Sequence, residues 1–547
     1  MGVCAFRMQE SLLLALPDPC LLAVLQFCAA SDQRSLFSAA RTHSKLHQAA
    51  AAALRSITAD LPQLQQAHSV KLYLRNHAQH VSSINLTATE AYPVRVRQFP
   101  PELQLKSLQL EWFHLQLLPG TPRQVSNPLL PQPSFQGVLG DAASVAALTQ
   151  LRLADCDLLD ELSSGGLAAL SVLPTGLEHL SISRIYSGSF KAHFPAGVLP
   201  RLQQLTYLEL AGMYLLHPPM AESLGLPPVF FFGMEGNGKE GEGEGIKAWE
   251  TAALQPLQAL TRLVELRLDR LQFDRGEDTS HCRITASIIP SSSHLKRLVL
   301  SGGVELEPNA LAGKTQLQML DLDLAHTVSA AAEVAQLLSH IRVLQGMTHL
   351  HLRSLNLWGI EQDSPPAAAY SALTASSKLQ HLDISGSRVA VGVWAHIFPA
   401  GRQLPHLHSL NIEDVQAPNN QTTTMPEGSR LVSCCSSLRY LNLRGLQGLN
   451  AARLAPLQGL SGLQTLDIGG VGLTAEGWQA VCQLAGLREL DVSYPCATRE
   501  ALLQSTQLQH LTRLVCRGCR GFGEDLAVTA QVGWGYDCLT QARHVMC

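Results

Sequence analysis

A short apolar motif that recurs along the chain constrains the fold more than any other feature. It reads apolar, two variable residues, apolar, one variable residue, apolar, as in Leu263, Leu266 and Leu268. About fifteen copies occur, and those from Leu263 onward begin 22 to 32 residues apart. So many copies at near-regular spacing predict a repeat protein whose units pack only on their neighbours. The copies begin at Val81, Leu105, Leu148, Leu177, Leu205, Leu263, Leu295, Leu317, Met347, Leu379, Leu407, Leu438, Leu463, Leu487 and Leu511.

The motif also predicts the local structure. Because neighbouring side chains in a strand point to opposite faces, the leucines lie on one face and the variable residues on the other. Helix-like stretches at residues 329–338, 454–460 and 476–484 lie between the expected strands. Over residues 80–530 the pattern resembles the leucine-rich-repeat family. The resemblance implies an α/β solenoid, a horseshoe of about fifteen repeats with parallel strands on the concave face and helices on the convex face.

Composition shifts suggest three parts. We expect a small helical unit at residues 1–60, the leucine-rich-repeat solenoid at 61–530 and a C-terminal tail or cap at 531–547. Segments near 119–134, 212–250 and 415–429 interrupt the repeat and are predicted to be loop insertions. The second lies within a gap of 58 residues between Leu205 and Leu263 and carries a Gly/Glu run that lacks the phosphate-loop pattern.

The totals limit the classes of partner. The net charge is -4, charged residues are 15% of the chain, and the pI is about 6.6, which argues against nucleic acid as the main ligand. Thirteen scattered cysteines indicate reduced thiols. No long unbroken apolar stretch predicts a membrane span. The expectation is a cytoplasmic protein, with a nuclear or a cytoskeletal and axonemal location as alternatives, that binds neither membranes nor nucleic acids.

The segment before the first repeat allows two interpretations. It is a plain cap that shields the first repeat, or it is a docking element. The second interpretation comes from a resemblance to the F-box, although Pro19, Ala40 and His43 depart from that family's preferences. The resemblance implies binding to the Skp-type adaptor of a cullin ubiquitin ligase. The residues that match the F-box pattern, and would contact the adaptor, are Leu16, Pro17, Leu21, Val24, Asp32, Leu36 and Arg41.

F-boxes joined to leucine-rich repeats form a known architecture. The resemblance therefore implies a substrate-recognition subunit of a ubiquitin ligase, in which the repeats hold a substrate protein and other subunits supply the chemistry. Its advantage would be effective concentration. The alternative is an interaction scaffold without ligase activity, similar to ribonuclease-inhibitor-like or axonemal repeat proteins.

One stretch of the expected concave face is rich in ionisable side chains. The motif spacing places this stretch on three neighbouring strands. It allows three interpretations: a solvated polar ladder, a hot spot for a partner, or a metal site. Glu265, Arg267 and Asp269 form a second polar strand with the same alternatives. The first stretch comprises Asp321, Asp323, His349, His351, Arg353, His381 and Asp383.

Residues that carry chemistry elsewhere are sparse. Cys516 and Cys519 make a single C-x-x-C pair, whereas a structural zinc site needs two such pairs, so we expect no metal there. Cys434 and Cys435 are expected to be buried as small apolar residues. No hydrolase, zinc-protease or kinase motif is present. The sequence therefore predicts a protein-binding chain without catalytic residues or cofactors, and not an enzyme.

Overall fold

The structure is a computed structural model of the chain. Two units, each with more contacts inside it than to the other, make up the chain: residues 1–263 with 271–280, and residues 264–270 with 281–547. The structure describes residues 21, 24–25, 49–50, 55–61, 64–89, 94–96, 99–100, 102–116, 146–159, 173–187, 190–191, 193–194, 196–215, 254–273, 280–284, 289, 293–302, 304–324, 331–355, 365–390, 392–416, 426–446, 449–493, 507–515 and 530–531.

The first unit contains a parallel sheet. In chain order its described strands are β1 (Ser56–Asp60), β2 (Ser83–Thr87), β4 (Ser107–Glu111), β6 (Gln150–Ala154), β8 (His179–Ser183) and β12 (Tyr207–Ala211). Each pairs with the next in the same direction and in step, so that the same motif position repeats from strand to strand. Helix α5 (Leu64–His77) and the short 3-10 helix η1 (Ala78–His80) connect β1 to β2.

Further short elements complete this unit. One small sheet joins β3 (Val94–Val96), β5 (Phe113–Gln116), β7 (Asp157–Leu159), β9 (Tyr186–Ser187) and β10 (Phe190–Lys191). A second runs through β11 (His193–Phe194), β13 (Tyr214–Leu215) and β15 (Gln272–Phe273). The 3-10 helices η2 (Ala196–Arg201) and η3 (Gln255–Ala259) pack on each other.

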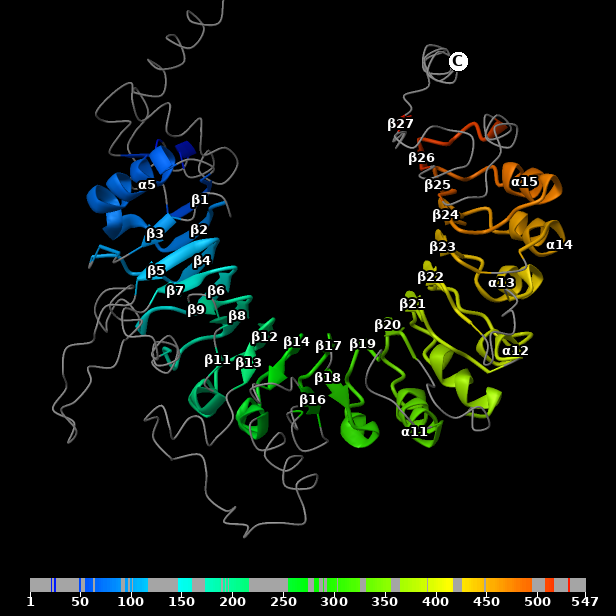
Figure 1. The fold of residues 1–547 in the computed structure, drawn as a ribbon, viewed down its shortest axis with the longest axis horizontal. Coiled ribbons are helices and arrows are strands. Elements are labelled where there is room, and N and C mark those ends of the chain that lie inside the picture. Colours follow the sequence, from blue (N-terminus) through cyan, green and yellow to red (C-terminus); the bar gives the residue numbers. More distant parts are fainter. Residues whose placement is uncertain are drawn as a thin grey trace, which may run out of the picture. The chain divides into compact units, whose positions relative to one another are not determined.

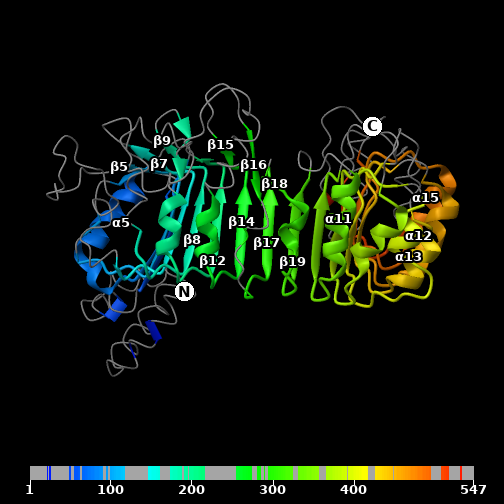
Figure 2. The ribbon, with the colours of Figure 1, turned by 90° about the horizontal axis from the view of Figure 1, so that it is seen from below.

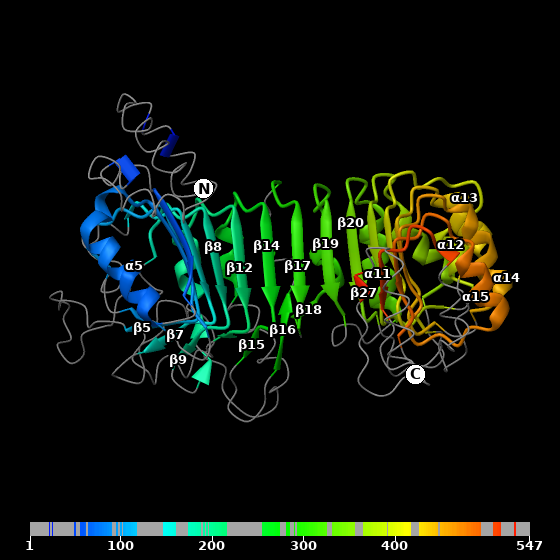
Figure 3. The same ribbon diagram turned by 90° about the horizontal axis from the view of Figure 1, so that it is seen from above.

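The second unit continues the same design with a longer sheet. Its parallel strands are β14 (Glu265–Asp269), β17 (Arg297–Ser301), β19 (Met319–Asp323), β20 (His349–Arg353), β21 (His381–Asp383), β22 (Ser409–Asn411), β23 (Tyr440–Asn442), β24 (Thr465–Asp467), β25 (Glu489–Asp491) and β26 (Arg513–Val515). They pair in this order and in step. Strand β27 (Ala530–Gln531) pairs antiparallel with β26. Figures 2 and 3 show strands of this unit side by side.

Helical segments alternate with these strands. They are η4 (Pro308–Leu311), α11 (Ala331–Arg342), η5 (Ala367–Thr374), α12 (Trp394–Ile397), α13 (Gly428–Cys434), α14 (Ala451–Leu454), η7 (Ala455–Gly459) and α15 (Ala475–Cys482). Within this unit the strands line the concave side and the helices the convex side (Figure 1). The short strands β16 (Ser280–Ile284) and β18 (Val304–Leu306) also pair.

The core of the second unit lies between the two layers. The motif leucines fill it from the sheet, since Leu350, Leu382 and Leu441 are at most 1% exposed. Helix α11 fills it from the other side with Val334, Leu337, Leu338 and Ile341, whose spacing of three and four residues places them on one face of the helix. Burying a leucine side chain contributes about 2 kcal/mol, so the repetition of the motif stabilises the whole stack.

The predicted fold is confirmed. Each motif copy found in the sequence falls on a described parallel strand of its unit, and each unit folds as a leucine-rich-repeat solenoid. The helices expected at 329–338 and 476–484 correspond to α11 and α15, and the stretch 454–460 contains the end of α14 and η7. Of the predicted insertions, 119–134 lies outside the described residues. In the insertion predicted near 212–250, residues 214–215 form strand β13; in the one near 415–429, residues 428–429 begin helix α13.

One boundary differs from the sequence expectation. The sequence predicts that residues 56–60 belong to the helical N-terminal unit, but they form strand β1 of the first unit. Ile57 and Ala59 lie in register with Ile84 and Leu86 of β2. The motif was missed here because alanine stands where the later copies have a larger apolar residue. Most of the predicted tail at 531–547 lies outside the described residues.

Candidate partner-binding surface

The side chains opposite the leucines form three files across the sheet of the second unit. Strand register places the first residue of each strand in one file, the third in the middle file, and the fifth, where the strand is long enough, in the last. The middle file is the most polar. From β19 to β25 it contains Asp321, His351, Asp383, Asn411, Asn442, Asp467 and Asp491.

Asp321 is the centre of the predicted polar stretch. Its Oδ1 accepts a hydrogen bond of 2.8 Å from the Arg353 guanidinium, and its Oδ2 lies 3.4 Å from Nδ1 of His351. Burial raises the pKa of Asp321, but the hydrogen bond from His351 and the charge of Arg353 outweigh burial, and the net pKa is lowered. The buried Nε of Arg353 has no hydrogen-bond partner among the residues described. The Asp321 carboxylate is therefore charged and held in place by the Arg353 guanidinium.

The first file contains a pair of stacked imidazoles. His349 of β20 and His381 of β21 are register neighbours, and their ring centroids lie 4.3 Å apart with an interplanar angle of 13°. Burial lowers the pKa of His349 to about 4, helped by the nearby His381, His351 and Arg297. Burial also lowers the pKa of His381. Both rings are consequently neutral at pH 7 and present an aromatic surface.

Asp383 has a different role from Asp321. Its Oδ1 accepts a hydrogen bond of 2.9 Å from the backbone N–H of Ser385, two residues later, which is the geometry of an Asx turn. The same turn follows each of the next four strands. The later acceptors are Asn411, Asn442, Asp467 and Asp491, at 3.1, 3.0, 2.9 and 2.9 Å from the N–H they bind.

The predicted residues thus divide into groups. The structure brings Asp321, His351 and Arg353 into one ion-paired group, and it stacks His349 on His381. Asp323 lies in register with Arg353. Burial lowers the pKa of the Arg353 guanidinium, but Asp321, and after it Asp323 and Asp383, outweigh burial, and the net pKa is raised. Asp383 binds its own backbone. The repeated Asx turns were missed by sequence reasoning, although Asp or Asn at a fixed motif position was visible.

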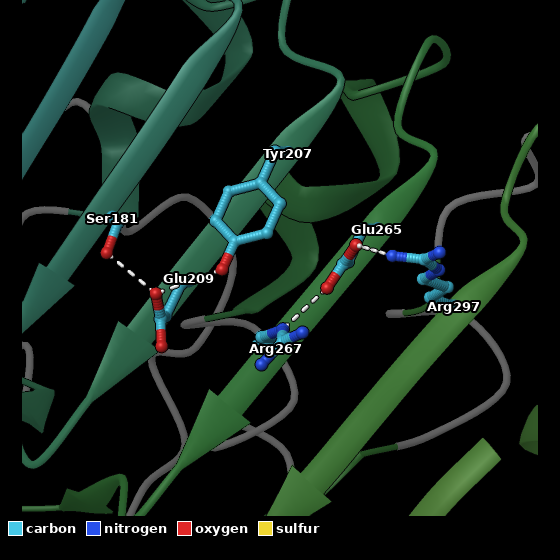
Figure 4. A network of polar contacts seen from close by, with 6 residues as sticks. All are labelled: Ser181, Tyr207, Glu209, Glu265, Arg267 and Arg297. Carbon is cyan, nitrogen blue, oxygen red and sulfur yellow. Dashed lines mark hydrogen bonds and ion pairs between the residues drawn. The ribbon is translucent and has the colours of Figure 1, made fainter. Parts of the chain in front are cut away.

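The second predicted polar strand is held by ion pairs. Glu265, which is 8% exposed, accepts from Arg267 Nε at 2.5 Å and from an Arg297 guanidinium nitrogen at 3.2 Å (Figure 4). Asp269 pairs with Arg270 at 2.9 Å and accepts from the Ser301 hydroxyl at 2.7 Å. Two cations on one carboxylate fix these side chains in place, so the strand is preorganised.

The first unit has a smaller polar group of its own, which the sequence analysis did not single out. Glu209 Oε2 accepts from the Ser181 hydroxyl at 2.7 Å and from the Tyr207 hydroxyl at 3.0 Å (Figure 4). The Tyr207 ring stacks on His179 with centroids 3.9 Å apart. The register of β8 and β12 places Tyr207 beside His179 and Glu209 beside Ser181, and the motif spacing in the sequence is the signal that predicts this pairing.

The F-box-like residues are only partly described. Leu21 and Val24 are helical; Leu21 is 1% exposed and Val24 is 39% exposed. Leu16, Pro17, Asp32, Leu36 and Arg41 lie outside the described residues. An exposed valine on a helix, next to a buried leucine, is compatible with both the capping and the docking interpretation.

Other functions would need features such as a metal-binding cluster, reactive cysteines or a membrane-spanning helix. No group of three or more His, Cys, Asp or Glu side chains in the described part of the chain could hold a metal ion. Cys516 and Cys519 lie outside it. The expected burial of Cys434 and Cys435 is confirmed at 1% and 0% exposure. No described helix combines the length and the apolar character that crossing a membrane requires.

Comparisons with known proteins find similar folds but no matching sequence. No protein-family model matches the chain, and no curated protein sequence does. One similar solved structure is an internalin from Listeria monocytogenes, with a TM-score of 0.40, 16% identity, and coverage of 68% of this chain and 81% of the internalin. Another is a leucine-rich-repeat protein from Leptospira interrogans, with a TM-score of 0.39, 16% identity, and coverage of 86% and 92%. The fold assignment rests on the strand register and buried motif leucines of this chain.

Proposed function

We propose that this chain is a non-catalytic scaffold that binds a partner protein on the polar face of its second unit. The observation that carries the proposal is a long run of neighbouring strands. Along each strand, buried leucines on one side alternate with mostly half-buried polar residues on the other. A polar face fixed by turns and ion pairs loses little entropy when a partner docks.

The size of this face favours a protein partner. Ten parallel strands extend from β14 to β26, and nine steps of about 4.8 Å make a surface on the order of 40 Å long. Small-molecule sites are compact, concave and mostly apolar, whereas this surface is extended and polar. A typical protein interface takes roughly 20 to 30 residues from each partner, and a surface of this length can supply that many.

The test uses substitutions that block the face without touching the core. Ser409 and Thr465 lie in its first file and are half-buried, so Ser409→Arg with Thr465→Arg projects two long cations from it. Val343, which is 54% exposed beside α11, provides the matched control Val343→Arg. Proteins retained by the tagged full chain are identified by cross-linking and mass spectrometry. Partners should be lost with the face variant and kept with the control; equal retention by all three proteins would refute the proposal.

A finer proposal concerns the N-terminal helix. We propose that the chain is the substrate-recognition subunit of a cullin-type ubiquitin ligase, with its F-box-like residues bound to the Skp-type adaptor. Support comes from the match of Leu21 and Val24 to the F-box pattern and from the exposure of Val24. An exposed apolar side chain on a helix is available for the apolar burial on which adaptor binding depends.

Co-purification with the adaptor tests the ligase role. Val24→Asp places a charge in the expected interface, and Leu72→Asp on α5 is a control because Leu72 is 52% exposed outside the F-box-like residues. The adaptor should co-purify with the wild type and with Leu72→Asp, but not with Val24→Asp. If the adaptor never co-purifies while the polar face still binds a partner, the chain is a scaffold without ligase activity.

A further inference from the structure

The middle file of the sheet has an unbalanced charge between β21 and β25. It contains three carboxylates and two amides, and no lysine or arginine. Asp467 and Asp491 are direct register partners on adjacent parallel strands. Like charges at such positions repel each other. The file consists of Asp383, Asn411, Asn442, Asp467 and Asp491.

Three arginines that border this file are paired with other acids. Arg444 Nε lies 3.5 Å from Glu413, which follows β22, and an Arg513 guanidinium nitrogen lies 3.5 Å from Glu489 in the first file. Arg353 is paired with Asp321. Among the described residues, no ion pair within 4 Å reaches Asp383, Asp467 or Asp491. A net negative charge therefore remains along the centre of the face.

The turns hold these carboxylates in a defined orientation. One oxygen of each accepts the N–H two residues later, and the other oxygen accepts no hydrogen bond from the residues described. The pKa of Asp467 is raised because burial, with the neighbouring Asp491 and Glu413, outweighs the Gly469 N–H and the charge of Arg444, which lower it. A cation that docked against the file would remove this repulsion.

Aromatic rings lie alongside the carboxylates. The stacked His349 and His381 and the half-buried Tyr440 all belong to the first file, next to the middle file. A guanidinium group can stack on an aromatic ring and donate hydrogen bonds to a carboxylate at the same time. The two files together provide both kinds of contact, which an acidic patch alone does not.

We propose that the face of β20 to β25 binds a protein segment rich in arginine or lysine. The inference rests on the proposed function, since it names the chemical class of the partner held on the same face. Arginine side chains would pair with Asp383, Asp467 and Asp491 and stack on the rings of the first file. The partner contributes the positive charge that the face lacks.

The natural asparagines of the file supply the variant that tests this proposal. Asn411 and Asn442 form the same turn as the aspartates, so Asp383→Asn, Asp467→Asn and Asp491→Asn together remove three charges and keep the turn acceptors. The matched control is Glu333→Gln with Glu427→Gln and Glu476→Gln, which removes three charges from or beside helices α11, α13 and α15. Urea unfolding verifies that both triple variants are folded.

The probe is a fluorescent peptide of alternating arginine and serine, compared with the same peptide carrying neutral citrulline in place of arginine. Anisotropy titrations at 150 mM salt should give binding of the arginine peptide only. The face variant should bind it about tenfold or more weakly, and the helix variant as tightly as the wild type. Equal weakening in both variants would mean that net charge alone attracts the peptide, and an unchanged affinity of the face variant would likewise overturn the proposal.

The two proposals can fail separately. Suppose that the wild type does not bind the arginine peptide, but that Ser409→Arg with Thr465→Arg still abolishes binding of the cross-linked partners. The face then binds a protein of another charge class, and only the present inference is wrong. If Ser409→Arg with Thr465→Arg leaves all the partners bound, the proposed function itself is wrong.

Discussion

Strands β14, β17, β19 and β20 of the second unit each contain five residues, whereas β21 to β25 each contain three. In the longer strands the polar residues interact across the sheet, as Asp321 does with Arg353 and Glu265 with Arg297. In the shorter strands the Asp or Asn of the middle file binds the backbone of its own turn. The same residue type at the same register position therefore has two roles.

The comparison shows how one repeat can serve both rigidity and recognition. Where the carboxylate is committed to an arginine, the charge is balanced within the sheet. Where the carboxylate accepts the N–H of its own turn, this one hydrogen bond uses only part of its capacity to accept hydrogen bonds, and its charge remains available to a partner. Substitutions that separate turn formation from charge test this distinction.

The largest expected effect is at Asn442. This side chain is 4% exposed, accepts from Arg444 N–H at 3.0 Å and donates to Glu413 Oε2 at 3.1 Å. Asn442→Ala removes both bonds in a buried place, which should lower the free energy of unfolding by about 2 kcal/mol. Asn411→Ala is the control, since the more exposed Asn411 makes the turn bond alone, and should cost about 1 kcal/mol. Urea unfolding measures both; equal costs would contradict the assignment.

The next effect compares one substitution at two aspartates. Asp321→Asn removes the charge that Arg353 and His351 contact and should cost about 1 kcal/mol, a value that allows for the partial exposure of Arg353. Asp383→Asn keeps the turn acceptor and should change stability by less than about 0.5 kcal/mol. Urea unfolding of both variants at low and at high salt measures the two losses in unfolding free energy. Equal losses at both sites would show that the two parts of the sheet do not differ as described.

The sequence predicted the stacking of the strands because the leucine spacing alone determines which residues share the core. It therefore also placed His349 beside His381 and Asp321 beside His351. It could not predict that Asp321 and Asp383 behave differently, because both follow the same motif leucines. That difference depends on whether Arg353 is within reach and on the backbone of the turn that follows.

Acidification should affect the histidine stack. The pKa of His349 is lowered to about 4, below the value of about 6.5 for an unfolded chain, so the unfolded state binds the proton first as the pH falls. The contribution of His349 to stability is thus largest above pH 6.5 and is lost between pH 6.5 and 4, by about 1 kcal/mol after discounting for solvent exposure.

His349→Gln should flatten this part of the stability profile, whereas the exposed His406→Gln should leave it unchanged. Urea unfolding at half-unit intervals from pH 7.5 to 4.5 measures the slope. An unaltered slope in His349→Gln would exclude His349 as its source.

The smallest expected effect is a gain in stability. Asp467 faces Asp491 across the sheet, and the pKa of Asp467 is raised by burial and by that neighbour, so its charged form is disfavoured in the folded state. Asp467→Asn keeps the acceptor for Gly469 N–H and removes the repulsion, and should stabilise the protein by about 0.5 kcal/mol at pH 7. The gain should vanish near pH 3, where the Asp467 carboxyl is protonated in both the folded and the unfolded state. A loss of stability at pH 7 would mean that Asp467 is held by a cation, and the negative charge attributed to this file would then be balanced within the chain.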